Sequence, residues 1–119
     1  MRVLAFDTAL SGCSAAFYDG RAHAFEITPM ERGQAEQLVP MIDRVLQKAG
    51  ADYADIEKIV TTVGPGAFTG LRVGLSTARA LGLALDIPVA GVSTFDVIAR
   101  KFLNENKLHE DESLCVLLE

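Results

Sequence analysis

A glycine-rich stretch at the centre of the chain, residues 64–74 (GPGAFTGLRVG), most constrains how this sequence can fold. Residues 58–63 before it are β-branched and apolar, which predicts a buried strand. Residues 71–85 after it have the composition of a helix. A glycine turn that leads from a strand into a helix is a common anion site in α/β folds, because the first N–H groups of the helix lack partners.

Small residues recur at every fourth position from the end of this turn, at Gly70, Gly74, Ala78 and Gly82. Residues with this spacing lie on one face of a helix. Each glycine inside a helix costs about 0.5–1 kcal/mol relative to alanine, so a row of them needs a compensating reason. The row predicts that another helix or a sheet approaches this face closely.

The turn does not match the common phosphate-binding motifs. A P-loop needs four residues between its glycines and a lysine after the second, whereas Gly66 and Gly70 are too close and no lysine follows. A dinucleotide-binding fingerprint needs a third glycine where Thr69 stands, and Pro65 interrupts the turn.

The composition is that of one soluble domain with its own core. Half of the 119 residues are hydrophobic and 23% are charged. The net charge is −5 without a basic cluster, so the chain is a poor candidate for binding nucleic acid by itself. Cys13 and Cys115 have no CxxC neighbour, which favours free thiols over metal or redox chemistry. No stretch has the length of a signal peptide or a membrane span, and we expect a cytoplasmic protein without membrane contact.

Hydrophobic periodicity predicts the order β-β-β-α-β-α-β-α. The first three strands are expected to form an antiparallel meander with a hairpin turn at Asp19-Gly20. The later strands are joined by helices, which predicts an α/β fold with a mixed five-stranded sheet and helices packed on it. The expected strands are 2–6, 12–18, 21–27, 58–63 and 87–92, and the expected helices are 33–49, 69–85 and 95–104.

Polar residues at strand ends are candidates for a binding site. Asp7 and Thr8 end the first strand and are expected at the same sheet edge as Gly64 if the two strands are parallel. They could hold a phosphate or hydrated metal, or form an Asx turn, and the sequence leaves both open. Arg72 has the forked guanidinium that suits a carboxylate or anion at this edge, although a solvated arginine is the alternative.

Two common catalytic arrangements are not indicated. His23 and His109 each lack a second histidine three or four residues away, which argues against a zinc site on one helix. No serine lies in a Gly-x-Ser-x-Gly elbow, which argues against a hydrolase triad.

Four stretches together resemble the bacterial TsaB family, also called YeaZ. They are residues 1–9 (MRVLAFDTA), 37–42 (QLVPMI), 64–74 and 88–94 (PVAGVST), and they extend over essentially the whole chain in order. Members of that family are about twice as long, as expected of two domain-sized lobes. The resemblance therefore implies an N-terminal lobe at 1–104, with a linker and the start of a truncated second lobe at 105–119.

The resemblance implies an actin-like, Hsp70-like fold of the ribonuclease H type. It also implies a non-catalytic role in making N6-threonylcarbamoyladenosine in tRNA next to the anticodon, together with a TsaD-type catalytic subunit and a TsaE-type ATPase. ATP and a metal would then belong to the partner subunits, and tRNA would be contacted only indirectly. Such proteins are often catalogued as glycoprotease-like or peptidase M22.

The catalytic paralogue carries a metal-binding His-x-x-x-His on its first helix, and residues 31–40 here contain no histidine. Neither peptidase nor carbamoyl-transfer chemistry is therefore expected, although a metallopeptidase and a stand-alone ATP-binding protein stay as alternatives. The resemblance makes the following residues relics of a nucleotide-binding lobe with weak or absent ATP binding: Asp7, Thr8, Gly64, Pro65, Gly66, Thr69 and Arg72.

The helices at 33–49 and 69–85 are expected to form a contact surface for the catalytic subunit, or for a second copy in a homodimer. The first helix is apolar around much of its circumference, and the second offers the row of small residues. The alternative, that the row faces the chain's own sheet, stays open. The expected interface residues are Leu38, Met41, Ile42, Val45, Gly70, Gly74, Ala78 and Gly82.

Overall fold

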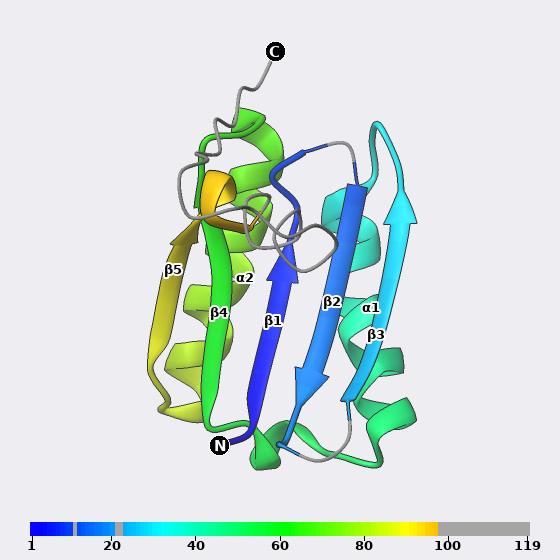
Figure 1. Ribbon diagram of the computed structural model, residues 1–119, viewed down its shortest axis with the longest axis vertical. Coiled ribbons are helices and arrows are strands. Elements are labelled where there is room, and N and C mark those ends of the chain that lie inside the picture. Colours follow the sequence, from blue (N-terminus) through cyan, green and yellow to red (C-terminus); the bar gives the residue numbers. More distant parts are fainter. Residues whose placement is uncertain (11, 21–22, 98–119) are drawn as a thin grey trace, which may run out of the picture.

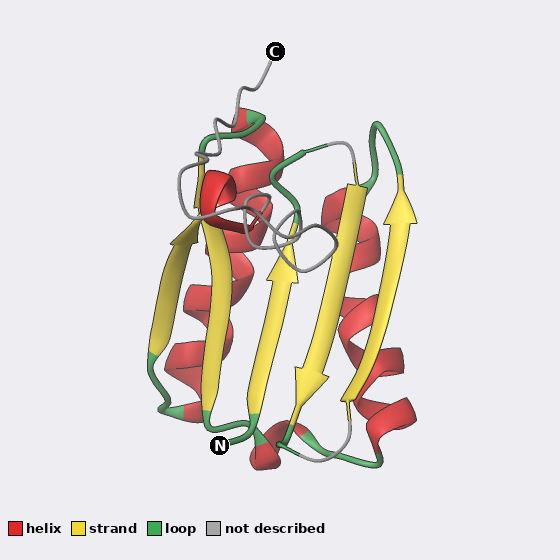
Figure 2. Cartoon of the chain, in the orientation of Figure 1, coloured by secondary structure: helices red, strands yellow, loops and turns green. Residues whose placement is uncertain are grey.

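The computed structural model describes residues 1–10, 12–20 and 23–97 as a five-stranded sheet with two helices packed on one face (Figures 1 and 2). The elements are β1 (Val3–Asp7), β2 (Gly12–Tyr18), β3 (His23–Pro29), α1 (Gln34–Ala49), the 3₁₀ turn η1 (Tyr53–Asp55), β4 (Lys58–Gly64), α2 (Phe68–Leu85) and β5 (Val89–Ser93). Residues 94–97 are helical, on the side of the sheet opposite to α1 and α2. The rest of the helix expected at 95–104, and the domain boundary expected at 104, lie outside the described residues.

The strand order is β3-β2-β1-β4-β5. β1 pairs antiparallel with β2 and parallel with β4, and β4 pairs parallel with β5. The prediction of a mixed five-stranded sheet with an antiparallel meander is confirmed. α1 connects β3 with β4 across β2 and β1, and α2 connects β4 with its neighbour β5. Both connections join parallel strands and run in the same direction across the sheet, so right-handed crossovers place both helices on the same face. The register pairs Phe6 with Thr61, which brings the ends of β1 and β4 together.

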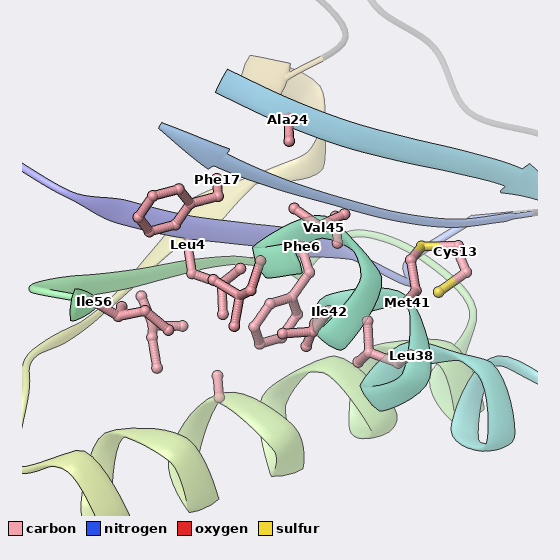
Figure 3. Close-up of a cluster of buried hydrophobic side chains, with 14 residues drawn as sticks. Leu4, Phe6, Cys13, Phe17, Ala24, Leu38, Met41, Ile42, Val45 and Ile56 are labelled. Atoms are coloured by element: carbon pink, nitrogen blue, oxygen red, sulfur yellow. The ribbon is translucent and has the colours of Figure 1, made fainter. Parts of the chain in front are cut away.

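The core lies between the sheet and the two helices (Figure 3). Leu4 and Phe6 of β1 point to the helices, while Ala5 and Asp7 point to the other face, as the twofold period of a strand requires. From α1, the core receives Leu38, Met41, Ile42, Val45 and Leu46. The apolar face of α1 therefore packs on the chain's own sheet.

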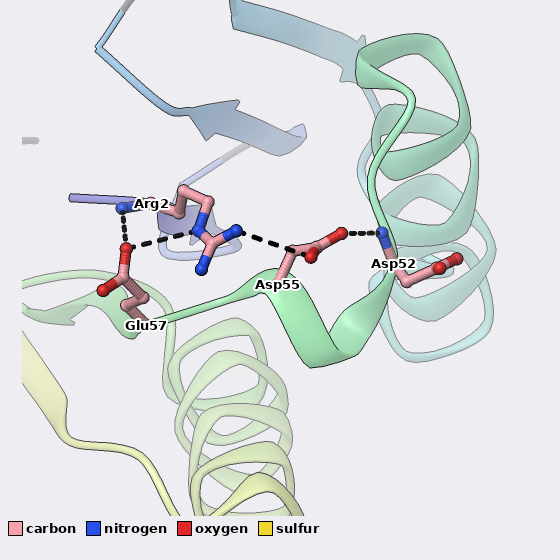
Figure 4. A network of polar contacts seen from close by, with 4 residues as sticks. All are labelled: Arg2, Asp52, Asp55 and Glu57. Carbon is pink, nitrogen blue, oxygen red and sulfur yellow. Dashed lines mark hydrogen bonds and ion pairs between the residues drawn. The ribbon is translucent and has the colours of Figure 1, made fainter.

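A polar network at the opposite end of the sheet aligns β1 with β4 (Figure 4). The backbone N–H of Arg2 donates to Glu57 Oε1 at 2.9 Å, and the Glu57 N–H donates to the Arg2 carbonyl at 2.9 Å. The Arg2 guanidinium also contacts Asp55 at 3.5 Å. These side chains are about half exposed, so water screens their charges and the network mainly fixes register. Within the described ranges, no helix is long and apolar enough to cross a bilayer.

Candidate functional site

The carboxyl ends of β1 and β4 and the first turns of α1 and α2 surround an open pocket of about 1000 Å³. Ala9 and Leu10 line it from the loop after β1, residues 31–36 from the start of α1, and residues 65–67, 69 and 70 from the glycine turn. Figure 1 places the first turns of both helices at this end of the sheet. The pocket therefore lies where the sequence predicted a binding site.

The glycine turn is held tightly against the loop that follows β1. The Ala67 N–H donates to the Ala9 carbonyl at 2.7 Å, and the Thr8 hydroxyl donates to the Gly70 carbonyl. A Cβ at Gly66 would lie 2.4 Å from the Ala9 carbonyl oxygen, and one at Gly70 would lie 2.0 Å from that of Thr8. Glycine is needed at these two positions because backbone approaches backbone there.

Thr8, one of the expected relics of a nucleotide-binding lobe, does not line the pocket. Its side chain is buried toward α2, and its hydroxyl is used by Gly70. Because neighbouring residues of a strand point to opposite faces, Thr8 and Asp7 are separated by the sheet rather than brought together.

Asp7 forms the Asx turn that was the alternative reading of this residue. Its Oδ1 accepts hydrogen bonds from the Ala9 N–H at 2.8 Å and from the Thr62 hydroxyl at 2.6 Å. Asp7 lines a different groove, on the face of the sheet that α1 and α2 leave uncovered. The sequence analysis missed Thr62, which the parallel pairing of β1 with β4 places beside Asp7.

The remaining predicted nucleotide-binding residues divide between two places. Pro65, Gly66 and Thr69 line the pocket, and Gly64 provides the turn with φ 125°, a conformation that favours glycine. Arg72 lies on the exposed side of α2, where its guanidinium stacks over the Phe68 ring at 5.0 Å. Among the described residues, no carboxylate forms an ion pair with Arg72, and an anion as its partner stays a prediction.

The pocket combines opposing charges. Neither Gly33 before α1 nor Ala67 before α2 caps its helix with a side chain, which leaves first-turn N–H groups that attract anions. Glu31 and Glu36 also line the pocket and repel anions, while Arg32 attracts them. The described part of the chain holds no cluster of three histidine, cysteine or carboxylate side chains that could bind a metal ion.

The expected contact surface is corrected by the structure. Its α1 members, Leu38, Met41, Ile42 and Val45, are at most 1% exposed and belong to the core. Its α2 members, Gly70, Gly74, Ala78 and Gly82, are also buried.

The row of small residues on α2 faces the chain's own sheet. A Cβ at Gly74 would lie 2.9 Å from the Thr8 hydroxyl oxygen and 3.1 Å from that of Thr61. A Cβ at Gly82 would lie 2.5 Å from Val89 of β5. The alternative left open by the sequence therefore holds, and a partner would have to contact the opposite sides of the two helices.

Comparisons with known proteins agree with this fold. The family described as "TsaD: tRNA N6-adenosine threonylcarbamoyltransferase" matches residues 27–119. The chain is 39% identical over 108 residues to "tRNA threonylcarbamoyladenosine biosynthesis protein TsaB" of Escherichia coli, covering 89% of this chain and 46% of that protein. The solved structure of YeaZ from Pseudomonas aeruginosa superposes with a TM-score of 0.85 at 32% identity, over 87% of this chain and 49% of that one.

The chain belongs to the TsaB/YeaZ family. Its sheet and helices have the actin-like, ribonuclease H-type fold of that family, as predicted. It spans about half the length of the curated relatives it matches. A shorter region, 52% of this chain, is 45% identical to a "tRNA N6-adenosine threonylcarbamoyltransferase" of Erythrobacter litoralis, of which it covers 18%.

Proposed function

We propose that this chain acts in the formation of N6-threonylcarbamoyladenosine in tRNA as an accessory subunit. It binds and activates a TsaD-type catalytic subunit and contacts tRNA only through that subunit. The observation that carries the proposal is the 39% identity to the Escherichia coli protein named for this biosynthesis. We also propose a cytoplasmic location, in keeping with this role.

The residues at the pocket support an accessory rather than a catalytic role. Residues 31–40, at the start of α1, contain no histidine, and Gln34 and Glu36 line the pocket there. Thr8 and Asp7, which could have met a nucleotide, are used in hydrogen bonds within the chain. In this proposal, ATP and the metal belong to the catalytic subunit and to a TsaE-type ATPase.

The outward sides of α1 and α2 are the surface that we assign to the partner. α2 exposes Phe68 and Leu83, which are 73% and 87% exposed, along the side opposite to its glycines. Its charged residues are Arg72 and Arg79, whereas α1 exposes the acids Glu36 and Asp43. Exposed apolar side chains near both ends of α2, with arginines between them, suit a helical partner, which is the catalytic subunit or, when that is absent, a second copy of this chain.

Affinity purification with a tagged TsaD-type subunit from the same source tests the proposal. The unchanged chain should be retained, and Phe68→Asp should weaken binding by about tenfold or more, because a charge would replace an exposed apolar side chain of this surface. Tyr18→Asp is the matched control, since Tyr18 is 54% exposed but lies at the end of β2, away from both helices. Equal retention of both variants would mean that the outward sides of the helices are not the interface. If the unchanged chain is not retained, the TsaD-type subunit is not its partner.

A glycoprotease-like metallopeptidase is the second candidate, because one similar solved structure is titled "similarity to peptidase YEAZ". Zinc analysis and digestion of casein separate the two functions. Stoichiometric zinc with metal-dependent proteolysis would support the peptidase. The third candidate is a stand-alone ATP-binding protein. Calorimetry with ATP should find weak or no binding to this chain. Sub-micromolar affinity, about 8 kcal/mol or more, would need a complete nucleotide site and would support this candidate.

A further inference from the structure

The outward sides of α1 and α2 carry exposed charges of opposite sign. By helical periodicity, Glu36 and Asp43 lie opposite to the core residues of α1, and Arg72 and Arg79 lie opposite to the small residues of α2. All four residues are exposed. Within the described ranges, none of them forms an ion pair. The surface therefore offers an acidic helix and a basic helix next to each other.

The two acids and the two arginines have the same spacing. Each pair is seven residues apart, which is two helical turns or about 10.5 Å along the axis. The helices lie side by side on one face of the sheet and begin at the same end (Figure 2). Ala35 of α1 lines a groove together with Thr69 and Arg72 of α2, so the first turns of the two helices are level. The acids and the arginines therefore stand at matching heights.

We propose that two copies of this chain pair through these helices around a twofold axis that runs along them. Rotation about such an axis keeps each residue at its height and lays α1 of each copy on α2 of the other. Glu36 then meets Arg72 of the second copy, and Asp43 meets Arg79 of the second copy. This inference rests on the assignment of the outward helix sides to a partner in the proposed function, and it adds the direction and register of the pairing.

The charges decide between the two ways in which the helix layers can stack. A twofold axis that runs across the helices would lay α1 on α1 and α2 on α2, with acids facing acids and arginines facing arginines. Like charges at an interface are unfavourable. The bases of α1, Arg44 and Lys48, do not compensate, because both pair with Glu26 of β3 at the side of the helix.

The residues between the charges fit the same register. A pairing that joins residue 36 to 72 and residue 43 to 79 also lays Pro40 on Ser76 and Gln47 on Leu83. Pro40 and Ser76 are short side chains, so the helices can approach closely at the centre. Leu83, which is 87% exposed in the single chain, would be covered by the stem of Gln47.

Exchange of charges in the full chain, followed by sedimentation equilibrium of the chain alone, tests the proposal. Arg79→Glu and Asp43→Arg should each weaken the pairing of copies by about tenfold or more, and their combination should restore most of it. The matched control combines Arg79→Glu with Glu36→Arg. It makes the same change of charge, but the two residues lie about two helical turns apart in the proposed register, so it should not restore pairing.

A second pair of substitutions guards against a loss of folding. Asp43 accepts a hydrogen bond from the Tyr53 hydroxyl, so circular dichroism has to show that Asp43→Arg keeps the fold. If it does not, Glu36→Arg combined with Arg72→Glu makes the same exchange at the other level. The control with Glu36→Arg and Arg79→Glu serves both sets.

Three results would overturn the proposal. An unchanged chain that stays monomeric at about 1 mM would mean that copies do not pair, and the proposed function would still stand if this monomer binds the TsaD-type subunit. Restoration by the control combination would mean that α1 meets α2 in the opposite direction. Failure of both matched combinations to restore pairing would mean that α1 of one copy does not lie on α2 of the other.

Discussion

The glycines of α2 offer a graded test of how closely the helix packs on the sheet. Replacing a helical glycine by alanine normally stabilises a protein by about 0.5–1 kcal/mol, because alanine restricts the unfolded chain and favours the helix. In α2, the added methyl group meets three different obstacles. The sign and size of each effect can therefore be worked from the structure.

The obstacle at Gly70 is rigid backbone. The new Cβ would lie 2.0 Å from the Thr8 carbonyl oxygen, which is about 1.4 Å short of ordinary contact at 3.4 Å. Moving the backbone also breaks the hydrogen bond from the Thr8 hydroxyl to the Gly70 carbonyl. Overpacking of this kind costs about 1–3 kcal/mol, which outweighs the gain in helix propensity.

The obstacles at Gly74 and Gly82 are softer. At Gly74 the nearest atom is the Thr8 hydroxyl oxygen at 2.9 Å, so a shift of about half an ångström restores contact at 3.4 Å. At Gly82 it is Cγ2 of Val89, and this side chain is 41% exposed on an edge strand and can rotate away. We expect the order of destabilisation Gly70→Ala, then Gly74→Ala, then Gly82→Ala, with the last close to neutral.

Urea unfolding followed by circular dichroism measures the series. Ser76→Ala is the control for helix propensity, because Ser76 is exposed on the same helix. A stabilising Gly70→Ala, or three equal effects, would refute the packing of this face on the sheet.

Two predictions concern pH. Arg44 donates a hydrogen bond to Glu26 at 3.0 Å and holds the pKa of the Glu26 carboxyl below its ordinary value. The stabilisation from this pair is therefore present above the ordinary pKa of glutamate and is lost as the pH falls through the lowered pKa of the folded state. Glu26→Gln should flatten the decline of the urea midpoint between about pH 5 and pH 3. Burial and the hydrogen bond to Asp43 raise the pKa of Tyr53, so its contribution is present below about pH 10 and is lost above it. Tyr53→Phe should therefore make the loss of stability between pH 9 and pH 11 shallower, and an unchanged slope would contradict the raised pKa.

The sequence by itself determined the order of elements and the place of the pocket. Strands and helices have different hydrophobic periods, so the meander, α1 and the strand before the glycine turn could be located within a few residues. The turn also indicated the correct edge of the sheet, because the carboxyl ends of parallel strands meet there.

Only the tertiary structure decided what each face contacts. The row from Gly70 to Gly82 required a close neighbour, but its spacing is the same whether that neighbour is a partner helix or the chain's own sheet. Asp7 and Thr8 are adjacent in the sequence, but neighbouring side chains of an extended chain point to opposite faces of the sheet. Asp7 therefore lines the groove on the face without α1 and α2, and Thr8 is buried beneath α2. Thr62 became a partner of Asp7 through pairing between strands far apart in the chain, a contact that local periodicity does not encode.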